Sequence, residues 1–148
     1  MTTVASYLEK LFSLEGKVVL FTGAAGGIGS ALCKALAQAG ASVALCDINL
    51  SSLQALQGEI VQADGVASVH LLDVTNKENI SACVEEIVRM YGHIDVLVNC
   101  AGINKRTGLA DYDEQTYDRI MNINLKGTFF VTQAVARQMK EQFLRTGK

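Results

Sequence analysis

The stretch Thr22-Gly23-Ala24-Ala25-Gly26-Gly27-Ile28-Gly29 decides the fold of this 148-residue chain. It lies between an apolar run at residues 17–22 (KVVLFT) and a segment of helical periodicity at residues 28–39. Glycines allow the chain to turn sharply, the backbone to approach a pyrophosphate and the helix to pack close to the strand. The free N–H groups and positive dipole end of that helix then face the phosphates. A glycine loop between a strand and a helix therefore predicts a dinucleotide site.

The rest of the chain repeats the alternation of apolar runs and amphipathic stretches. Further strands are predicted at residues 42–47, 66–73 and 94–99, the last being apolar enough for burial on both faces. This order is typical of βαβ units, and right-handed crossovers then give the strand order 3-2-1-4. We therefore predict the N-terminal portion of a Rossmann fold, a doubly wound parallel α/β sheet. Residues 1–16 form an N-terminal tail in this interpretation, and residues 17–148 form the dinucleotide-binding domain, truncated before a fifth strand.

Helices are predicted from apolar periodicity and from capping residues. Asn49 is expected to cap one helix, and Thr75-x-x-Glu78 is expected to open another as a capping box. A long helical stretch is predicted from about residue 113 to residue 143. The apolar stripes expected on these helices consist of Ile28, Ala31, Leu32, Ala35, Leu36 and Ala39; of Leu50, Leu53, Leu56 and Ile60; of Ile80, Cys83, Val84, Ile87, Val88 and Tyr91; and of Leu125, Phe129, Thr132, Ala136, Met139 and Phe143.

Asp47 ends the second predicted strand, eighteen residues beyond Gly29. A carboxylate at this place accepts hydrogen bonds from adenosine ribose hydroxyls and repels a 2′-phosphate. No Lys or Arg stands beside it or in the glycine loop to pair with such a phosphate. The sequence therefore favours NAD over NADP. The alternative is that Asp47 only caps the next helix.

The composition of the chain argues against several classes of binding partner. The formal net charge of -2 gives no basic field for a nucleic acid or an anionic membrane surface. No apolar run is long enough to span a bilayer, and the N-terminus lacks the pattern of a signal or transit peptide, so we expect a cytoplasmic protein.

The four cysteines (Cys33, Cys46, Cys83 and Cys100) are scattered, which argues against a disulfide framework and a metal site.

Taken in order, Thr-Gly-x-x-x-Gly-Ile-Gly, Asp47, Asp73-Val74, Asn99-Cys100-Ala101-Gly102 and Asn124 resemble the classical short-chain dehydrogenase/reductase family. The resemblance covers residues 12–148 and has the look of the gluconate 5-dehydrogenase and 3-oxoacyl-carrier-protein reductase branch. It implies hydride transfer between NAD and a small alcohol or carbonyl substrate.

The same resemblance assigns roles to individual residues. The cofactor site it implies consists of Gly23, Ala25, Gly26, Gly27, Ile28, Gly29, Asp47, Asp73, Val74, Asn99, Ala101 and Gly102. The Asp73 carboxylate and the Val74 backbone would contact adenine, and residues 99–102 would line the adenosine pocket. Cys100 stands where the family has a second Asn. Asn124 would be catalytic, with its backbone carbonyl holding a water in a proton relay. The alternatives are a helix cap for Asp73 and a structural kink for Asn124.

The family's chemistry also needs a serine and a Tyr-x-x-x-Lys motif after a fifth strand, and this sequence ends where that strand is expected to begin. We therefore expect the cofactor-binding portion of a longer oxidoreductase, inactive as the 148-residue chain alone. One alternative is a truncated family member that binds NAD or a full-length subunit. Another is a generic adenine-nucleotide or flavin-binding Rossmann module.

The expected substrate is suggested by residues 11–17 and 102–106, which look like the sugar-acid branch. Lys105 and Arg106 lie at the mouth of the expected cleft and could steer an anionic substrate. The alternative is a solvated basic loop. Because family members usually assemble through the helices of this region, we also expect a homo-oligomer formed through the long C-terminal helix.

Overall fold

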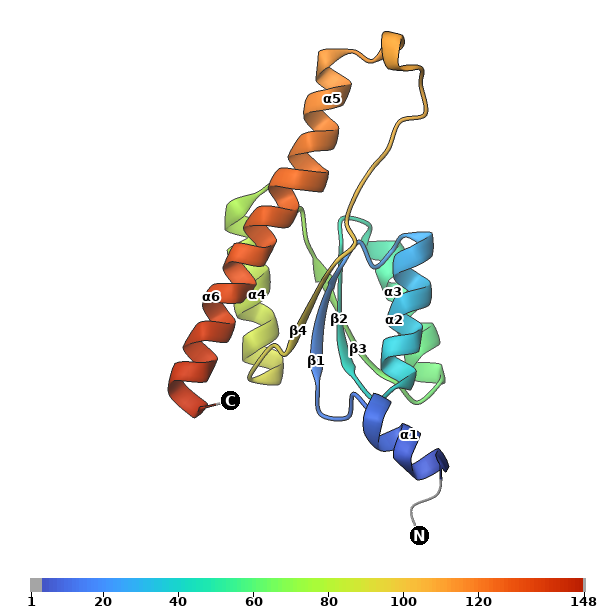
Figure 1. The fold of residues 1–148 in the computed structure, drawn as a ribbon, viewed down its shortest axis with the longest axis vertical. Coiled ribbons are helices and arrows are strands. Elements are labelled where there is room, and N and C mark those ends of the chain that lie inside the picture. Colours follow the sequence, from blue (N-terminus) through green and yellow to red (C-terminus); the bar gives the residue numbers. More distant parts are fainter. Residues whose placement is uncertain (1–3, 148) are drawn as a thin grey trace.

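A parallel four-stranded sheet forms the centre of the computed structural model, which describes residues 4–147. Its strand order is β3-β2-β1-β4, which confirms the predicted Rossmann order. The strands are β1 (Val18–Thr22), β2 (Ser42–Asp47), β3 (Val66–Leu71) and β4 (Val96–Asn99). Helices α2 (Gly27–Gln38) and α3 (Leu50–Gln62) cover one face, and α4 (Lys77–Tyr91) and α6 (Thr128–Thr146) cover the other (Figure 1).

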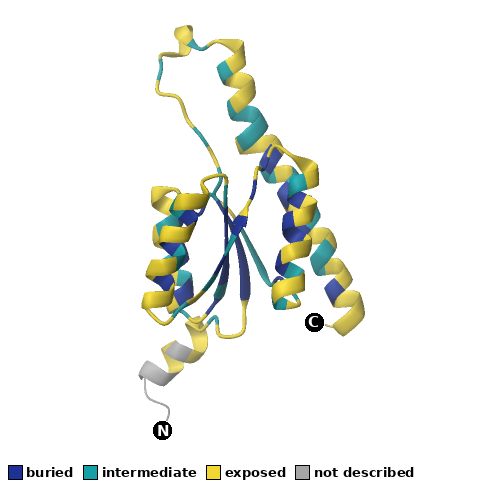
Figure 2. Ribbon diagram, turned by 180° about the vertical axis from the view of Figure 1, so that it is seen from behind, coloured by how far each residue is buried: buried dark blue, intermediate teal, exposed yellow. Residues whose placement is uncertain are grey.

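The core follows from this layering. All residues of β1 are buried, because the strand has a neighbour on each side and a helix layer on each face (Figure 2). Alternate side chains of β1 and β2 enter the two halves of the core: Leu20 and Cys46 face α4 and α6, while Phe21 and Leu45 face α2 and α3. The residues of β4 are only half-buried or exposed. The predicted burial of this strand on both faces is reached only in part: Val96 and Val98 pack against one half of the core and Leu97 against the other, and all three are half-buried.

The helix starts show which capping predictions hold. The Asn49 side chain accepts a hydrogen bond from Ser52 N at 3.1 Å, which confirms the predicted cap of α3. The capping box predicted at Thr75 is wrong. Asn76 caps α4 instead and accepts from Asn79 N at 2.9 Å, while the Thr75 hydroxyl donates to a carboxylate at residue 73.

The predicted stripe of α2 is not the face that packs against the sheet. The buried residues of this helix are Gly29, Cys33 and Ala37, whereas Ile28 and Leu32 are exposed. Small side chains face the sheet because they let the helix approach it closely. The predicted stripe of α4 is confirmed, with its first four members buried and its last two partly buried.

The long helical stretch is continuous but changes its winding. Helix α5 (Glu114–Met121) passes into a π-helix, η2 (Asn122–Gly127), and then into α6. The side chains of α6 that are buried are Val131, Val135 and Gln142. The predicted stripe is therefore wrong as a buried face: Phe129 and Phe143 are exposed, because the helix turns Val131 and Val135 toward the core instead.

Three short elements lie outside the three layers. Helix α1 (Val4–Phe12) falls in the segment predicted as a tail, and its Leu11 and Phe12 side chains are exposed. The 3-10 helix η1 (Leu109–Asp111) and α5 project beyond the carboxyl ends of the strands (Figure 1). Within residues 4–147 no helix is both long and apolar enough to cross a membrane.

Candidate cofactor site

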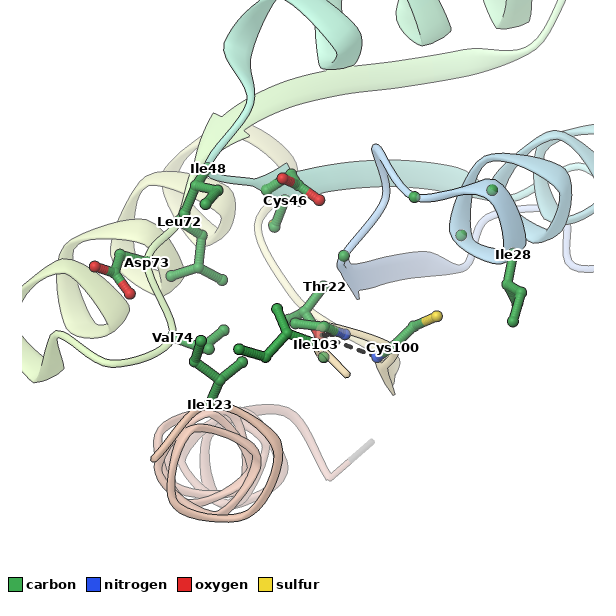
Figure 3. Close-up of a pocket in the computed structure, with 17 residues that line it drawn as sticks. Thr22, Ile28, Cys46, Ile48, Leu72, Asp73, Val74, Cys100, Ile103 and Ile123 are labelled. Carbon is green, nitrogen blue, oxygen red and sulfur yellow. Dashed lines mark hydrogen bonds between the residues drawn. The ribbon is translucent and has the colours of Figure 1, made fainter. Parts of the chain in front are cut away.

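A cavity of about 350 Å³ opens at the carboxyl ends of the strands (Figure 3). The residues that line it are Thr22, Gly23, Gly26, Gly27, Ile28, Gly29, Cys46, Asp47, Ile48, Leu72, Asp73, Val74, Cys100, Ala101, Gly102, Ile103 and Ile123. Ten of the twelve predicted cofactor residues are among them. The exceptions are Ala25 and Asn99, whose side chain donates to Thr132 Oγ1 at 3.0 Å.

The glycine loop is held by close backbone contacts. Gly23 has a φ of +71°, and a Cβ there would stand 2.7 Å from the Ala101 Cα. A Cβ on Gly29 would overlap the Gly23 carbonyl oxygen. Whereas asparagine or aspartate side chains cap α3, α4 and α5, the N-cap of α2 is Gly26 and no side chain caps it. The amides of the first turn of α2 are therefore available to an anion.

Asp47 stands where β2 meets the cavity. Its Oδ2 accepts from Ala25 N at 3.2 Å and its Oδ1 accepts from Asn49 N at 3.1 Å. These bonds orient the carboxylate, and each oxygen can accept a further hydrogen bond. Because Asn49 supplies the side-chain cap of α3, Asp47 is not merely that cap. No Lys or Arg occurs among the lining residues of this cavity in the described part of the chain.

Asp73 lies on the wall opposite Ile28, together with Leu72 and Val74 (Figure 3). Its Oδ1 accepts from Thr75 N at 2.9 Å and from Thr75 Oγ1 at 2.7 Å, and its own N–H donates to Asn79 Oδ1 at 2.6 Å. These contacts fix the turn after β3. Since Asn76 caps α4, the helix-cap alternative for Asp73 is not needed.

Thr22 is a positioning residue that was not among the predicted site residues. Its buried hydroxyl oxygen accepts from Cys100 N at 3.1 Å and from Ala101 N at 3.2 Å, and lies 3.4 Å from Val98 O, to which it donates (Figure 3). One side chain thus joins the end of β1 to the segment after β4. One feature of the sequence could have identified Thr22: it is a hydroxyl residue that ends an otherwise apolar strand directly before the glycines.

Asn124 lies in the π-helix η2, at the rim of the cavity. Its Oδ1 accepts from Ile103 N and its Nδ2 donates to Ile103 O, both at 2.9 Å. Its backbone carbonyl accepts from Thr128 Oγ1 at 2.8 Å. π-Helical turns occur mostly as local insertions in α-helices, frequently at functional sites. The helix is therefore irregular at Asn124, as the structural kink considered from the sequence requires. The role of the Asn124 carbonyl in a proton relay stays a prediction.

A second, open cavity of about 470 Å³ adjoins the first one at Ile103. Lys105 and Arg119 are the basic residues on its wall. Lys105 Nζ contacts Asp113 Oδ2 at 3.2 Å and Thr116 Oγ1 at 3.1 Å. Hydrogen bonds from Thr116, followed by the bond from Lys105, lower the pKa of Asp113 to about 2. Arg106 is not part of this wall.

Three of the four cysteines are buried in the core, and the fourth lines the cavity. Cys33, Cys46 and Cys83 are buried, and burial raises the pKa of the Cys33 thiol to about 12 and that of Cys46 well above its ordinary value. Cys100 is half-buried and lines the cofactor cavity. Within the described residues, no group of three His, Cys, Asp or Glu side chains is arranged to hold a metal ion.

The family model named short chain dehydrogenase matches residues 17–144. The chain belongs to this family. Among its curated relatives, the 3-oxoacyl-[acyl-carrier-protein] reductase of Thermotoga maritima is 45% identical over 129 residues, which are 87% of this chain and 52% of that protein. The gluconate 5-dehydrogenase of Gluconobacter oxydans is 43% identical over 130 residues, or 87% of this chain and 50% of that protein.

Solved structures agree with this membership. A short-chain type dehydrogenase/reductase from Mycobacterium marinum has a TM-score of 0.87 at 36% identity, covering 91% of this chain and 55% of that one. A xylitol dehydrogenase with bound NAD+ has a TM-score of 0.83 at 37% identity, covering 86% of this chain and 50% of that one. This short-chain dehydrogenase chain thus spans about half the length of the curated relatives and solved structures it matches.

Proposed function

We propose that this chain binds NAD as the cofactor-binding half of an oxidoreductase that transfers hydride between nicotinamide and the hydroxyl or carbonyl carbon of a small molecule. The observation that carries the proposal is the oriented Asp47 carboxylate at the mouth of a cavity whose described lining contains no Lys or Arg. Such a site attracts ribose hydroxyls and repels the additional phosphate of NADP.

Each part of the cavity has a task in this proposal. The first-turn amides of α2 would hold the pyrophosphate, and Asp47 would accept bonds from the adenosine ribose. Asp73 and Val74 would contact the adenine from the opposite wall. The nicotinamide, when bound, supplies the hydride chemistry. The backbone carbonyl of Asn124, which already accepts a hydrogen bond from Thr128 Oγ1, would accept a second one from a water in a proton relay.

The substrate we propose is anionic, as a sugar acid is. Lys105 and Arg119 stand on the wall of the second cavity, which shares Ile103 with the cofactor cavity. Asp113 partly neutralises Lys105, so Arg119 is the stronger anion-binding group. The relatives from Gluconobacter oxydans and Escherichia coli, called gluconate 5-dehydrogenase and 5-keto-D-gluconate 5-reductase, support this choice.

A second candidate function concerns these 148 residues taken by themselves. They contain no Tyr-x-x-x-Lys motif. On this alternative they bind NAD without turnover, either alone or beside a full-length subunit.

The test is an equilibrium titration of the 148-residue chain with NADH and with NADPH. We expect NADH to bind more tightly, and Asp47→Ala to weaken NADH binding roughly 10- to 100-fold, as the loss of about 1.5–3 kcal/mol of hydrogen bonding to a charged group requires. Asp118→Ala, an aspartate of α5 outside the cavity, is the matched control and should not change NADH affinity. Equal affinity for the two cofactors, or none for either, would contradict the proposal. Oxidation of sugar acids by the same chain would exclude the non-catalytic alternative.

A further inference from the structure

Two of the buried cysteines lie against each other in the core. Cys46 belongs to β2 and Cys83 to α4, and their Sγ atoms are 3.9 Å apart although the residues are 37 positions apart in the sequence. Cys46 Sγ also donates to Ala44 O at 3.5 Å. Neither thiol has a task in the proposed hydride transfer.

A disulfide between these two residues needs only a short movement. Bonded sulfur atoms lie about 2.05 Å apart, so the two Sγ atoms would have to approach each other by about 2 Å. β2 is fixed by its hydrogen bonds to β1 and β3, whereas α4 packs on the sheet through side chains. We therefore expect α4 to supply most of the movement, drawing toward β2 as the bond closes.

The surroundings of the pair keep it reduced until an oxidant arrives. Burial, followed by the hydrogen bond and charge of Cys83, raises the pKa of the Cys46 thiol well above its ordinary value, and Cys33 and Glu86 add to this effect. A further titratable neighbour is His70, which pairs with Cys46 across the sheet and whose Nδ1 lies 3.3 Å from Glu86 Oε2. Because the thiolate is the reactive form of cysteine, the pair reacts slowly at neutral pH.

The pair lies directly behind the cofactor cavity. Cys46, Leu72 and Val74 line that cavity (Figure 3), and all three belong to the same buried cluster as Cys83. A movement of Cys83 and α4 toward β2 is therefore passed on to the side chains that form the cavity wall, since a close-packed core transmits displacements.

Cys46 is also joined to the residues expected to hold the cofactor. Asp47 follows it on β2, and the Cys46 carbonyl oxygen accepts from Ala24 N in the glycine loop at 3.2 Å. A binding site needs its groups within about 0.5 Å of their productive positions. The closure of a Cys46–Cys83 disulfide exceeds this tolerance and would disturb the site.

We propose that Cys46 and Cys83 form a dithiol switch, in which a hydroperoxide oxidises the pair to a disulfide and the bond weakens cofactor binding. Cys46 has no exposed surface, so the oxidant enters by local opening of the cavity wall, and a small neutral molecule such as hydrogen peroxide suits this route. The effect on the cofactor rests on the proposed NAD binding, whereas formation of the bond does not.

The reaction proceeds in two steps. One thiol takes an oxygen atom from hydrogen peroxide, becomes a sulfenic acid and releases water. The other thiol then attacks the sulfenic sulfur, the S–O bond breaks, and a second water leaves as the S–S bond forms. The two thiols thus lose two electrons and two protons, and the peroxide is reduced to two molecules of water.

The experiment treats the 148-residue chain with hydrogen peroxide and then measures free thiols, cross-linked peptides and NADH affinity. We expect the loss of two of the four free thiols and a peptide containing Cys46 linked to one containing Cys83. NADH affinity should fall roughly 10-fold and return when dithiothreitol reduces the bond. Oxidation of separate cysteines without this link, or two copies linked through Cys100, would overturn the proposal.

Two variants separate the switch from ordinary cysteine oxidation. Cys83→Ala removes one thiol of the pair outside the cavity wall, so the reduced variant should bind NADH normally and peroxide should not lower its affinity. Cys33→Ala is the matched control, because Cys33 is equally buried but lies in the other half of the core, and it should keep the full response. Circular dichroism shows whether each variant is folded. An undiminished response of Cys83→Ala would show that another thiol, such as Cys100, is the target and would overturn the proposal.

The failure of the switch and the failure of the proposed function give different results. A reduced chain without NADH affinity would contradict the proposed function and the switch with it, even where the Cys46–Cys83 link is found. A reduced chain that binds NADH, together with a cross-linked chain that binds it equally well, would overturn the switch alone.

Discussion

Gln142 and Ile94 form a closed pair of hydrogen bonds between a side-chain amide and a peptide unit. Ile94 N donates to Gln142 Oε1 and Gln142 Nε2 donates to Ile94 O, both at 2.9 Å, and both residues are buried. Asn124 makes the same pair with Ile103 at the other end of the strand. The helices therefore hold both ends of the edge strand, whose outer side has no neighbouring strand within residues 4–147.

Gln142→Ala is expected to destabilise the chain strongly. It leaves the buried N–H and C=O of Ile94 without partners, at a cost of about 1–3 kcal/mol for each group. Urea unfolding followed by circular dichroism measures the difference. Gln138→Ala is the matched control, because Gln138 lies one turn earlier on α6 and its side chain donates only to Gln142 Oε1, at 3.2 Å. Equal losses of stability in the two variants would show that the Ile94 pair is not the cause.

The sequence alone was sufficient for the sheet and for the place of the glycine loop between β1 and α2. Strand order follows from the alternation of elements and the handedness of crossovers, both of which are local rules. Residues 42–47 were predicted as a strand with the bounds that the structure shows. The faces of α2 and α6 were predicted less well, because apolar periodicity does not distinguish a stripe that packs on the sheet from one that stays exposed. Leu32 and Phe129 belong to the second kind.

The lining of the cavity was predicted where residue type and local position were sufficient, as for Gly29 and Asp47, whose roles toward a cofactor stay predictions. Thr22 and Gln142 were missed because their roles depend on long-range contacts. The Thr22 hydroxyl binds amides 78 and 79 residues away, and Gln142 binds a peptide unit 48 residues away. Such long-range contacts leave no pattern of periodicity or spacing in a single sequence.

Gly29→Ala is expected to abolish NADH binding. The added Cβ would overlap the Gly23 carbonyl oxygen, so the glycine loop and the start of α2 must move apart. Gly58→Ala is the matched control, because Gly58 lies within α3 and a Cβ there meets nothing within 4 Å. That change should keep NADH affinity and raise stability by up to about 1 kcal/mol, the difference in helix propensity between Gly and Ala. Fluorescence titration and urea unfolding measure both effects, and normal NADH binding by the Gly29 variant would contradict the predicted packing.

Thr22→Val is expected to loosen the segment after β4. Valine has a similar shape and lacks the hydroxyl, so Cys100 N and Ala101 N lose their acceptor, at a cost of about 1–3 kcal/mol. Both residues line the cavity, so NADH affinity should fall together with stability. Thr22→Ser keeps the hydroxyl and should restore most of the affinity. If serine and valine weaken binding equally, the methyl group matters at this position and the hydrogen bonds do not.

The capping of α5 by Asp113 is expected to depend on acid pH. Its Oδ1 accepts from Thr116 N at 2.6 Å, and this bond, with those from the Thr116 hydroxyl and Lys105, lowers the pKa of Asp113 to about 2. Because this pKa lies below the unfolded value of about 3.9, the stabilisation is complete above about pH 4 and is lost as the pH falls toward 2.

Titration of the Asp113 carboxyl carbon and the Thr116 amide by NMR should therefore give a shared midpoint near pH 2. Fraying of α5 should be visible in the same range as faster hydrogen exchange. Asp113→Asn keeps an oxygen acceptor at the cap and removes the titration, so its Thr116 amide should not respond between pH 4 and pH 2. A midpoint near 4, or the same response in the asparagine variant, would show that the Thr116 and Lys105 bonds do not hold this carboxylate in solution.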